Sequence, residues 1–312
     1  MTMKKSRSTR PLFLALLTLT LSTLAFAVSP QEPPRVEWTP PAPREKAKTP
    51  FAPEPFGGDN IFKGEAESWL ADAITKVEAG RLEPVEDKFV ADYVAQLGQR
   101  LAAYSVAPSK QYRFIVLYDN EVNAMSIGGG RIYVNLGMLK NVESEDELAC
   151  VIAHEIGHDA FGHAPKTVTR QLFWMTGVRK VRNYEEVESS LEKLLDEYGK
   201  KPVAAIGESL LGFSRFNELE ADRAAFYDAY KAGYNPEALK TVFKRFEREE
   251  KAEAGKDYAM SQFMTLLFGS HPPTPQRETA ISWESNFVKM PPKGERYKSA
   301  AFDAMKARVS KL

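Results

Sequence analysis

The sequence is poor in the residues that cross-link a small domain or gather several thiolates around a metal. Its 312 residues include a single cysteine, Cys150, which excludes an internal disulfide and a zinc module made of several cysteines. Basic and acidic side chains balance at 42 each, so no excess charge favours nucleic acid or a strongly anionic partner. Histidine is also scarce, with four in the chain. Hydrophobic residues make up 43% of the sequence, which is enough for a sizeable core.

The first 27 residues have the layout of a secretory signal peptide. Basic residues in MTMKKSRSTR precede the apolar stretch PLFLALLTLTLSTLAFA, whose last three residues, Ala25-Phe26-Ala27, form a small-x-small cleavage triplet. We expect cleavage after Ala27 and export to a bacterial periplasm. The alternative is an uncleaved membrane anchor, because the apolar stretch is at the short end of the length that spans a bilayer. Contact with a membrane is expected only in that case.

Residues 28–58 are rich in proline and poor in core-forming side chains. Nine of the 20 prolines lie between Pro30 and Gly57, a composition typical of an extended, disordered linker. Beyond this linker, no repeat recurs at a solenoid period and no apolar run is long enough to cross a membrane. We therefore expect residues 59–312 to form a single domain.

That domain combines helical and extended patterns, which predicts a mainly helical α+β fold. Phe89, Tyr93 and Leu97 recur at four-residue spacing, as on one face of a helix. Residues 112–119, YRFIVLYD, are β-branched and aromatic and predict a strand. Short extended pieces flank three glycines at 128–130, which permit backbone conformations forbidden to other residues or the close approach of another chain.

Three of the four histidines cluster in the stretch CVIAHEIGHDAFGH, on a helix that we predict from about 145 to 162. Ser144 is expected to cap this helix, with Glu147 completing a capping box. His154 and His158 are four residues apart, so their imidazoles point to the same side, one turn apart. Two imidazoles in that arrangement can reach a single zinc ion.

Glu155 completes the pattern HEXXH, which is known from zinc peptidases. It lies about 100° around the helix from His154. There its carboxylate can take a proton from metal-bound water and return it to a leaving amine. The alternative interpretation is a solvated helix face that is rich in histidine and glutamate by chance. Cys150, one turn before His154, is expected to be a small buried residue and not a thiolate ligand.

A hydrolytic zinc site needs a third protein ligand and an open coordination position. The metzincin spacing would place glycine and histidine where this chain has Phe161 and Ala164, so that alternative fails. His163, five residues beyond His158, is expected to be a structural residue or a hydrogen-bonding partner of a ligand.

The segment SRFNELEADRAAF offers a carboxylate for the third position. Glu218 and Asp222 lie one turn apart on one face of a second predicted helix. Glu218 can therefore bind the ion while Asp222 accepts a hydrogen bond from a ligand imidazole and fixes its tautomer. Glu220 points to another side and is the weaker candidate. A plain acidic helix face is the alternative, and the joint occurrence with HEXXH argues against it.

Together these motifs resemble the gluzincin peptidases of the HtpX, BepA and Oma-type family, which also contains the type 1 CaaX prenyl proteases. HEXXH followed at a distance by Glu-x-x-x-Asp is the gluzincin arrangement. Further similar segments are NAMSIGGGRIYVNLGML, SRFNELEADR, AGYNP, GSHPPTPQRE and the closing helix AFDAMKARV. The resemblance covers about residues 80–309 and implies a minigluzincin-like fold, in which a second helical part supplies the glutamate.

The resemblance implies an exported zinc endopeptidase that hydrolyses extended or misfolded envelope proteins. One Zn²⁺ per chain would be held by His154, His158 and Glu218, with Asp222 orienting an imidazole. Glu155 would activate zinc-bound water, and polypeptide substrates would be the partners. A catalytically silent chaperone or assembly factor that uses the same groove is the alternative, and an intact Glu155 argues against it. A membrane-tethered scaffold is a further alternative.

The resemblance also assigns residues around the substrate. His271 and Arg277 would lie over the open metal position and stabilise the oxyanion, although the matching histidine of some relatives caps the metal in a latent state, so the role of His271 stays open. A strand packed on the zinc helix would be the sheet edge that accepts substrate as an added antiparallel strand; its residues are Gly129, Gly130, Arg131, Ile132, Tyr133 and Val134.

Two departures from the family pattern affect the site. Ile127 precedes the paired glycines where the family often has proline, so the local turn is expected to differ. The segments that replace the membrane hairpins of integral relatives are too short or too polar to span a bilayer. We expect these segments, TVTRQLFWMTGVRKV and VAAIGESLLGF, to form a cover over the cleft with the charged helix YEEVESSLEKLLDEYGKK.

Overall fold

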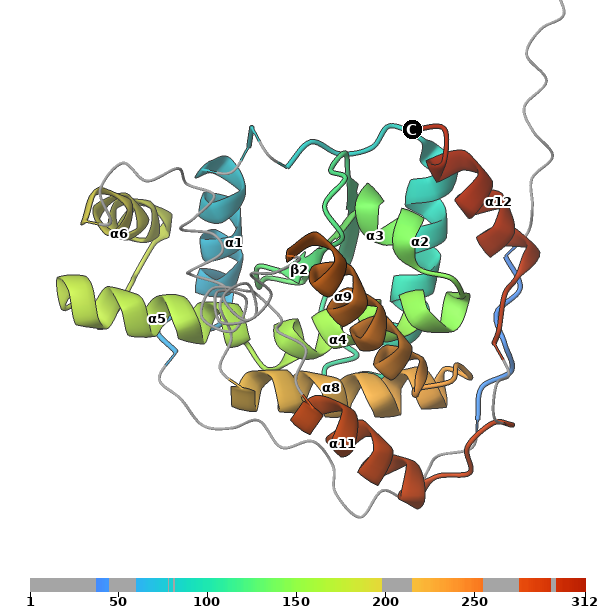
Figure 1. The fold of residues 1–312 in the computed structure, drawn as a ribbon. Coiled ribbons are helices and arrows are strands. Elements are labelled where there is room, and N and C mark those ends of the chain that lie inside the picture. Colours follow the sequence, from blue (N-terminus) through green and yellow to red (C-terminus); the bar gives the residue numbers. More distant parts are fainter. Residues whose placement is uncertain are drawn as a thin grey trace, which may run out of the picture. The chain divides into compact units, whose positions relative to one another are not determined.

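The computed structural model of this protein describes residues 38–44, 60–77, 79–80, 82–197, 215–254, 275–292 and 296–312 (Figure 1). The predicted signal peptide, most of the predicted linker, the segment VAAIGESLLGF and His271 lie outside the described residues. The rest agrees with a mainly helical α+β fold. The elements are α1 (Glu65–Val77), α2 (Lys88–Ala102), β1 (Arg113–Leu117), β2 (Ala124–Ser126), β3 (Arg131–Asn135), α3 (Leu136–Asn141), α4 (Glu145–Ala160), α5 (His163–Thr176), α6 (Tyr184–Glu197), α8 (Arg215–Lys231), α9 (Ala238–Ala254), α11 (Pro275–Glu284), a 3-10 turn (Ser285–Phe287) and α12 (Ala300–Val309).

The sheet has the strand order β1-β3-β2, with β3 parallel to β1 and antiparallel to β2. The prediction that residues 129–134 form a sheet edge is therefore wrong. Gly129 and Gly130 belong to the turn before β3, and Arg131, Ile132, Tyr133 and Val134 lie in β3, which is paired on both sides. The edge had been assigned from the family resemblance, and the local sequence does not distinguish a central strand from an edge.

Helix α4 carries the HEXXH motif and begins at a side-chain cap. The Ser144 hydroxyl accepts a hydrogen bond from Glu147 N (3.3 Å), as predicted. The Glu147 carboxylate, however, accepts from Glu143 N (2.7 Å), one residue earlier than in a standard capping box. The helix ends at Ala160, because Gly162 takes a left-handed conformation with φ of 65° and a new helix, α5, starts at His163.

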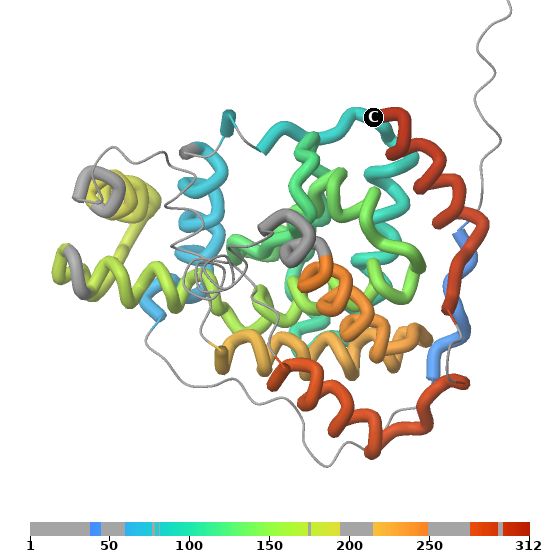
Figure 2. The backbone as a smooth tube through the Cα atoms, viewed as in Figure 1, coloured from blue at the N-terminus to red at the C-terminus, as the bar shows by residue number. Residues whose placement is uncertain are grey.

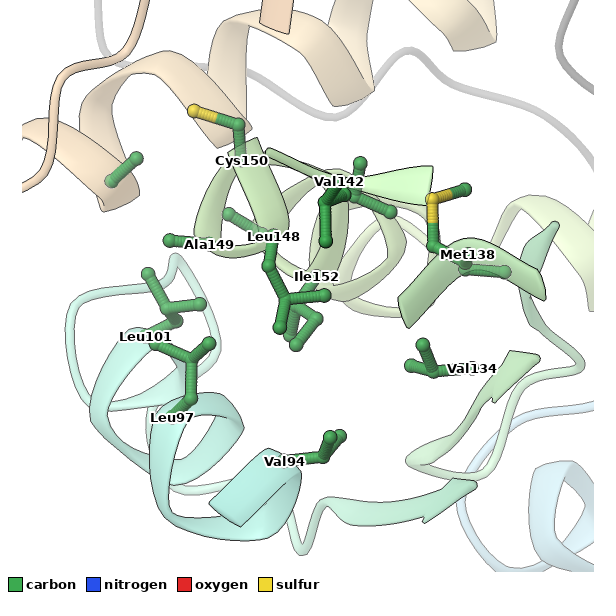
Figure 3. Packing of buried hydrophobic residues seen from close by; sticks show 14 of the residues in the cluster. Val94, Leu97, Leu101, Val134, Met138, Val142, Leu148, Ala149, Cys150 and Ile152 are labelled. Atoms are coloured by element: carbon green, nitrogen blue, oxygen red, sulfur yellow. The ribbon is translucent and has the colours of Figure 1, made fainter. Parts of the chain in front are cut away.

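The main hydrophobic core surrounds α4. In Figure 3, Leu97 and Leu101 of α2 face Ala149 and Ile152 of α4. Cys150 is buried, as predicted for a small apolar side chain, and its Sγ lies 3.5 Å from the carbonyl oxygen of Asn235.

Helices α4 and α8 lie side by side (Figure 2) and approach closely at one glycine. A Cβ on Gly157 would be 3.2 Å from the Cα and carbonyl oxygen of Ala221, which is tighter than most Cβ contacts, so the neighbouring backbone would have to shift by a few tenths of an ångström. Gly157 lies between the two HEXXH histidines and Ala221 lies between Glu218 and Asp222. The small residues therefore bring the two halves of the predicted metal site together.

A second, smaller core joins α1, α5 and α6. Its buried members include Phe62, Leu70, Val168, Leu172 and Val187. Helix α6 packs on both α1 and α5 (Figure 1).

Part of the predicted linker is bound to the domain. The Trp38 indole donates to Glu145 Oε1 (2.9 Å), and the Arg44 guanidinium donates to the carbonyl oxygen of Tyr234 (2.6 Å). Arg100 in turn donates to the carbonyl oxygen of Pro41 (2.5 Å). The prediction of a disordered linker over 28–58 is therefore wrong for residues 38–44. These contacts could not be predicted from the composition of the linker, because each joins residues that are far apart in the sequence.

Among the described residues, no helix combines the length and apolar character that crossing a bilayer requires.

Candidate metal centre

Three donor side chains from two helices converge beneath the sheet. His154 and His158 come from α4 and Glu218 from α8, and their ligand atoms all lie within 4.8 Å of one another. The two Nε2 atoms are 2.9 Å apart. The Glu218 carboxylate places Oε2 3.5 Å from His154 Nε2 and Oε1 3.3 Å from His158 Nε2. All three side chains are buried. The structure thus brings together the three residues predicted from sequence spacing.

The far side of the first imidazole meets a carboxylate. His154 Nδ1 lies 3.0 Å from Asp222 Oδ1, which is the position predicted for Asp222. A carboxylate at this nitrogen favours the tautomer with the proton on Nδ1. His154 Nε2 is then left with a lone pair that points at the other two donors.

The second imidazole is held by another histidine. His158 Nδ1 lies 2.8 Å from His163 Nδ1, and His163 Nε2 lies 3.0 Å from Glu220 Oε2. Because an ionised carboxylate only accepts hydrogen bonds, the chain is satisfied when His163 donates from Nε2 to Glu220 and His158 donates from Nδ1 to His163. His158 Nε2 then also carries a lone pair. His163 therefore occupies the hydrogen-bonding position expected for it, as the first residue of α5.

Glu220 is the member of this group that sequence analysis did not find. It was expected to point away from the site, and its side chain does lie on a different side of α8 from Glu218. His163 lies on the same side of α8 as Glu220, because the chain turns at Gly162 and returns toward α8. The signal present in the sequence was the pair of glutamates in NELEAD together with the third histidine.

Arg277 contacts two carboxylates of the site and also lines a pocket beside the donors. Its Nε and Nη2 donate to the two carboxylate oxygens of Asp222 at 2.7 Å each, and Nη1 lies 2.8 Å from Glu218 Oε2. The guanidinium also stacks 4.2 Å from the ring centre of Phe243. The oxyanion-stabilising role predicted for Arg277 stays a prediction. The guanidinium makes two hydrogen bonds to Asp222 and an ion pair with Glu218, and it thereby holds both carboxylates in place.

The ionisation of these groups follows from burial and from their neighbours. Burial alone lowers the pKa of His154, but Asp222 and Glu218 outweigh it and raise that pKa to about 9. Burial holds the pKa of His158 well below its usual range. Burial also opposes ionisation of Asp222, yet the Arg277 guanidinium keeps the pKa of that carboxyl below its ordinary value. The carboxylates around the two imidazoles thus favour a positive charge in this group, which is either a proton on His154 or a metal ion that replaces that proton at Nε2.

Zinc fits this donor set. Two imidazole nitrogens and one glutamate are a combination that catalytic zinc sites use, with a fourth position left for water or substrate. Donors placed about 2.0–2.1 Å from a tetrahedral ion are separated from each other by roughly 3.3 Å, close to the 2.9, 3.5 and 3.3 Å found here. The second nitrogen of each imidazole already has a partner, as bound metal requires.

A pocket opens beside the donors and contains the predicted general base. Glu155, which is 2% exposed, lines it together with His154 and Arg277. Asn123 and Ala124, at the start of β2, also line this pocket. The rest of the lining is mostly apolar and includes Leu239, Val242, Phe243 and Phe246 of α9.

Helix α9 was not predicted from the sequence to be part of the site. Its many charged residues obscure an apolar pattern that recurs at helical spacing. The cover was predicted from residues 167–181, 184–201 and 203–213, of which 198–201 and 203–213 lie outside the described residues. Among the described residues, the pocket lining includes none from α5 or α6, which pack with α1 around the second core.

Comparison with known proteins agrees with this geometry. Residues 90–284 match the model of Peptidase family M48. The beta-barrel assembly-enhancing protease of Escherichia coli (strain K12) is 22% identical over 194 residues, which cover 60% of this chain and 39% of that protein. The mitochondrial metalloendopeptidase OMA1 of Schizosaccharomyces pombe is 28% identical over 169 residues, or 54% of this chain and 47% of that protein. The metalloprotease LoiP of E. coli is 29% identical over 168 residues, covering 53% of this chain and 60% of that protein. The chain thus spans about two fifths of the length of the assembly-enhancing protease that it matches.

Proposed function

This chain belongs to peptidase family M48, and from that membership and the geometry of the site we propose that it is a zinc-dependent endopeptidase. The observation that carries the proposal is the convergence of His154, His158 and Glu218, together with the pocket that His154 lines beside Glu155. A metal-binding protein without catalysis needs the three ligands. It has no need of a buried carboxylate beside them in the same pocket.

The proposed chemistry divides between the ion and the side chains around it. Bound zinc would polarise the scissile carbonyl and lower the pKa of water. Glu155 accepts the proton of the attacking water and later donates it to the leaving amine. Asp222 and His163 keep the two imidazoles in the tautomer that presents Nε2. Arg277 holds Glu218 and Asp222 at their positions throughout.

Substrate binding is proposed at β2, which replaces the edge predicted at residues 129–134. Strand β2 pairs with β3 on one side, and no strand within the described ranges pairs with its other side. Ala124, its first residue, lines the pocket with His154 and Glu155. An extended peptide that adds to this edge would place its backbone next to the metal ligands and would be selected only weakly by its side chains.

We further propose that the protein is exported and acts on extended or misfolded polypeptides of the cell envelope. The support is the layout of residues 1–27 and the similarity to a protein named as a beta-barrel assembly-enhancing protease. N-terminal sequencing of the mature protein tests the export step. We expect the chain to start at Val28, and a chain that retains Met1 to Ala27 would instead support a membrane anchor.

Substitution of the general base tests the activity. We expect Glu155→Gln to lower the rate of casein cleavage by about 100-fold or more, because general-base catalysis contributes on that scale, while zinc content stays unchanged. Glu86→Gln, at an exposed position, is the matched control. If Glu155→Gln cleaves casein as fast as the wild type does, the peptidase proposal fails and a silent chaperone that uses the same groove becomes the better explanation.

A further inference from the structure

The three consecutive glycines before β3 form a turn that two distant carboxylates hold. Gly128, Gly129 and Gly130 all have positive φ, at 86°, 62° and 74°, a region that residues with a Cβ rarely adopt. Gly129 N donates to Glu67 Oε1 (3.1 Å) and Gly130 N donates to Asp159 Oδ2 (3.0 Å). Consecutive backbone N–H groups thus each meet an acceptor from a different helix, one from α1 and one from α4.

A lysine joins these two carboxylates. Lys110 Nζ donates to Glu67 Oε1 (2.7 Å) and to the Asp159 carbonyl oxygen (3.1 Å), and it forms an ion pair with the Asp159 carboxylate. Its side chain is 22% exposed and that of Asp159 is fully buried. Burial by itself opposes the charge on the lysine, but Asp159 and Glu67 outweigh it and raise the pKa of Lys110. The ammonium group is therefore positive and held between the two carboxylates.

Asp159 connects this cluster to both the metal helix and the proposed substrate edge. It follows His158 directly in α4. Its Oδ2 accepts from Ser126 Oγ (3.1 Å), at the end of β2, and from Gly130 N, next to the start of β3. The β2–β3 hairpin is thus attached at its turn to the residue beside a metal ligand. Neither Asp159 nor Lys110 is among the residues that line the pocket.

We propose that Lys110, Asp159 and Glu67 are positioning residues that set the distance and register between the β2 edge and the metal ligands. This proposal rests on the proposed function, because it takes β2 as the edge to which a polypeptide adds. Loss of the cluster would let the β2–β3 hairpin shift relative to α4. The scissile carbonyl of a peptide bound to β2 would then no longer align with the metal ligands. Long peptides, which use several backbone hydrogen bonds to the edge, would be affected most.

Peptide binding tests the proposal without depending on turnover. Zinc-loaded protein carrying Glu155→Gln would be titrated with an extended ten-residue peptide and with a three-residue peptide of the same central sequence. We expect Lys110→Met to weaken binding of the long peptide by about 5- to 10-fold, the loss of roughly one backbone hydrogen bond, and to change binding of the short peptide by less than about 2-fold. Zinc content should stay at the level of the parent protein.

Matched variants separate positioning from a general loss of structure. Lys110→Arg keeps the charge and should restore long-peptide binding, and Asp159→Asn should act in the same direction as Lys110→Met while keeping an acceptor oxygen. Lys88→Met removes an exposed lysine that pairs with Asp92, and we expect it to change the binding of neither peptide. Equal weakening of both peptides, or no weakening of the long one in a folded, zinc-loaded Lys110→Met or Asp159→Asn variant, would overturn the proposal.

The same proteins distinguish this inference from the proposed function. If protein with an intact Glu155 binds the long peptide and never cleaves it, the peptidase proposal fails, while the effect of Lys110→Met on binding still decides whether the cluster positions the edge. If cleavage occurs and the two peptides respond alike to Lys110→Met, the peptidase proposal stands and the positioning role is wrong.

Discussion

At the scale of single residues, the metal centre depends on which nitrogen of each imidazole carries the proton. His154 is oriented by a carboxylate, Asp222, whereas His158 is oriented by the neutral ring of His163, which in turn contacts Glu220. The two ligands are therefore held by partners of different charge. A carboxylate at the far nitrogen increases the basicity of an imidazole directly, whereas an intervening imidazole passes the effect on more weakly.

The role of His163 predicts an effect on metal affinity. We expect His163→Ala to weaken zinc binding by about 10- to 100-fold, the usual range for loss of a partner that orients a ligand. Competition with a chromophoric chelator would measure the affinity. Glu220→Gln keeps an acceptor oxygen for His163, so we expect a smaller loss of zinc affinity than in His163→Ala. A dissociation constant for His163→Ala equal to that of the wild type would show that His158 keeps its orientation unaided.

At this scale the metal-ligand side chains could be predicted from the sequence, whereas the residues that contact them could be predicted only in part. The positions of His154, His158, Glu218 and Asp222 follow from helical spacing within two short segments, and the structure brings these side chains together. The contacts of Arg277 could not be predicted in that way. They join α11 to α8 across 55 residues, and only the packing of the two helices decides which carboxylates the guanidinium meets.

At the scale of elements, α8 is a helix with buried polar contacts on several sides. Glu218 and Asp222 face α4, Glu220 faces His163, and Asp228 is buried near the other end. Most of the helix is buried, so its apolar residues do not form one stripe. Such a helix is hard to place from periodicity, because the polar residues that normally mark the solvent side lie inside.

The buried Asp228 predicts a pH-dependent stability. Burial raises the pKa of this carboxyl well above its usual value, and none of the described residues offers a hydrogen-bond partner to its Oδ2. The unfolded chain releases this proton near pH 3.9, whereas the folded chain retains it to higher pH. The side chain therefore lowers the free energy of unfolding progressively as pH rises from about 4 through the folded pKa. The amide introduced by Asp228→Asn cannot ionise, so this substitution should remove the dependence.

Urea denaturation at two pH values would check this. We expect Asp228→Asn to raise the free energy of unfolding at pH 8 by about 1 kcal/mol or more, with a smaller gain at pH 4.5. Asp303→Asn, at an exposed position, is the control. A gain that is equal at both pH values, or a loss of stability at pH 8, would contradict the expectation.

The elements themselves were predicted with uneven success. The helix of the HEXXH motif follows from its capping residue and apolar spacing, and the closing helix, α12, was expected from the family resemblance; the structure contains both. The sheet order did not follow, because strand pairing is a property of segments far apart in the sequence. The short β2 takes the edge that had been assigned to the longer and more apolar β3.

At the scale of the whole molecule, the N-terminus of α4 is where distant parts of the chain meet. Glu145 accepts from Trp38 and Tyr234, and Asp146 accepts from Asn235 N (2.8 Å) and Tyr297 N (2.6 Å). Three successive buried acidic residues at this end suit the positive end of the helix dipole. They attach residue 38, the turn after α8 and the segment before α12 to the helix that carries the metal ligands. The HEXXH helix is thus fixed at one end by these carboxylates and at the other by Asp159.

The number of zinc ions bound per chain tests the central claim most directly. It would be measured by elemental analysis after dialysis against a weak chelator, for the wild type, Glu155→Gln and Glu218→Gln. We expect one zinc in the wild type and in Glu155→Gln, because Glu155 is not a ligand, and close to none in Glu218→Gln, which loses the charged third donor. A folded Glu218→Gln protein that retains one zinc per chain would contradict the ligand set and the mechanism built on it.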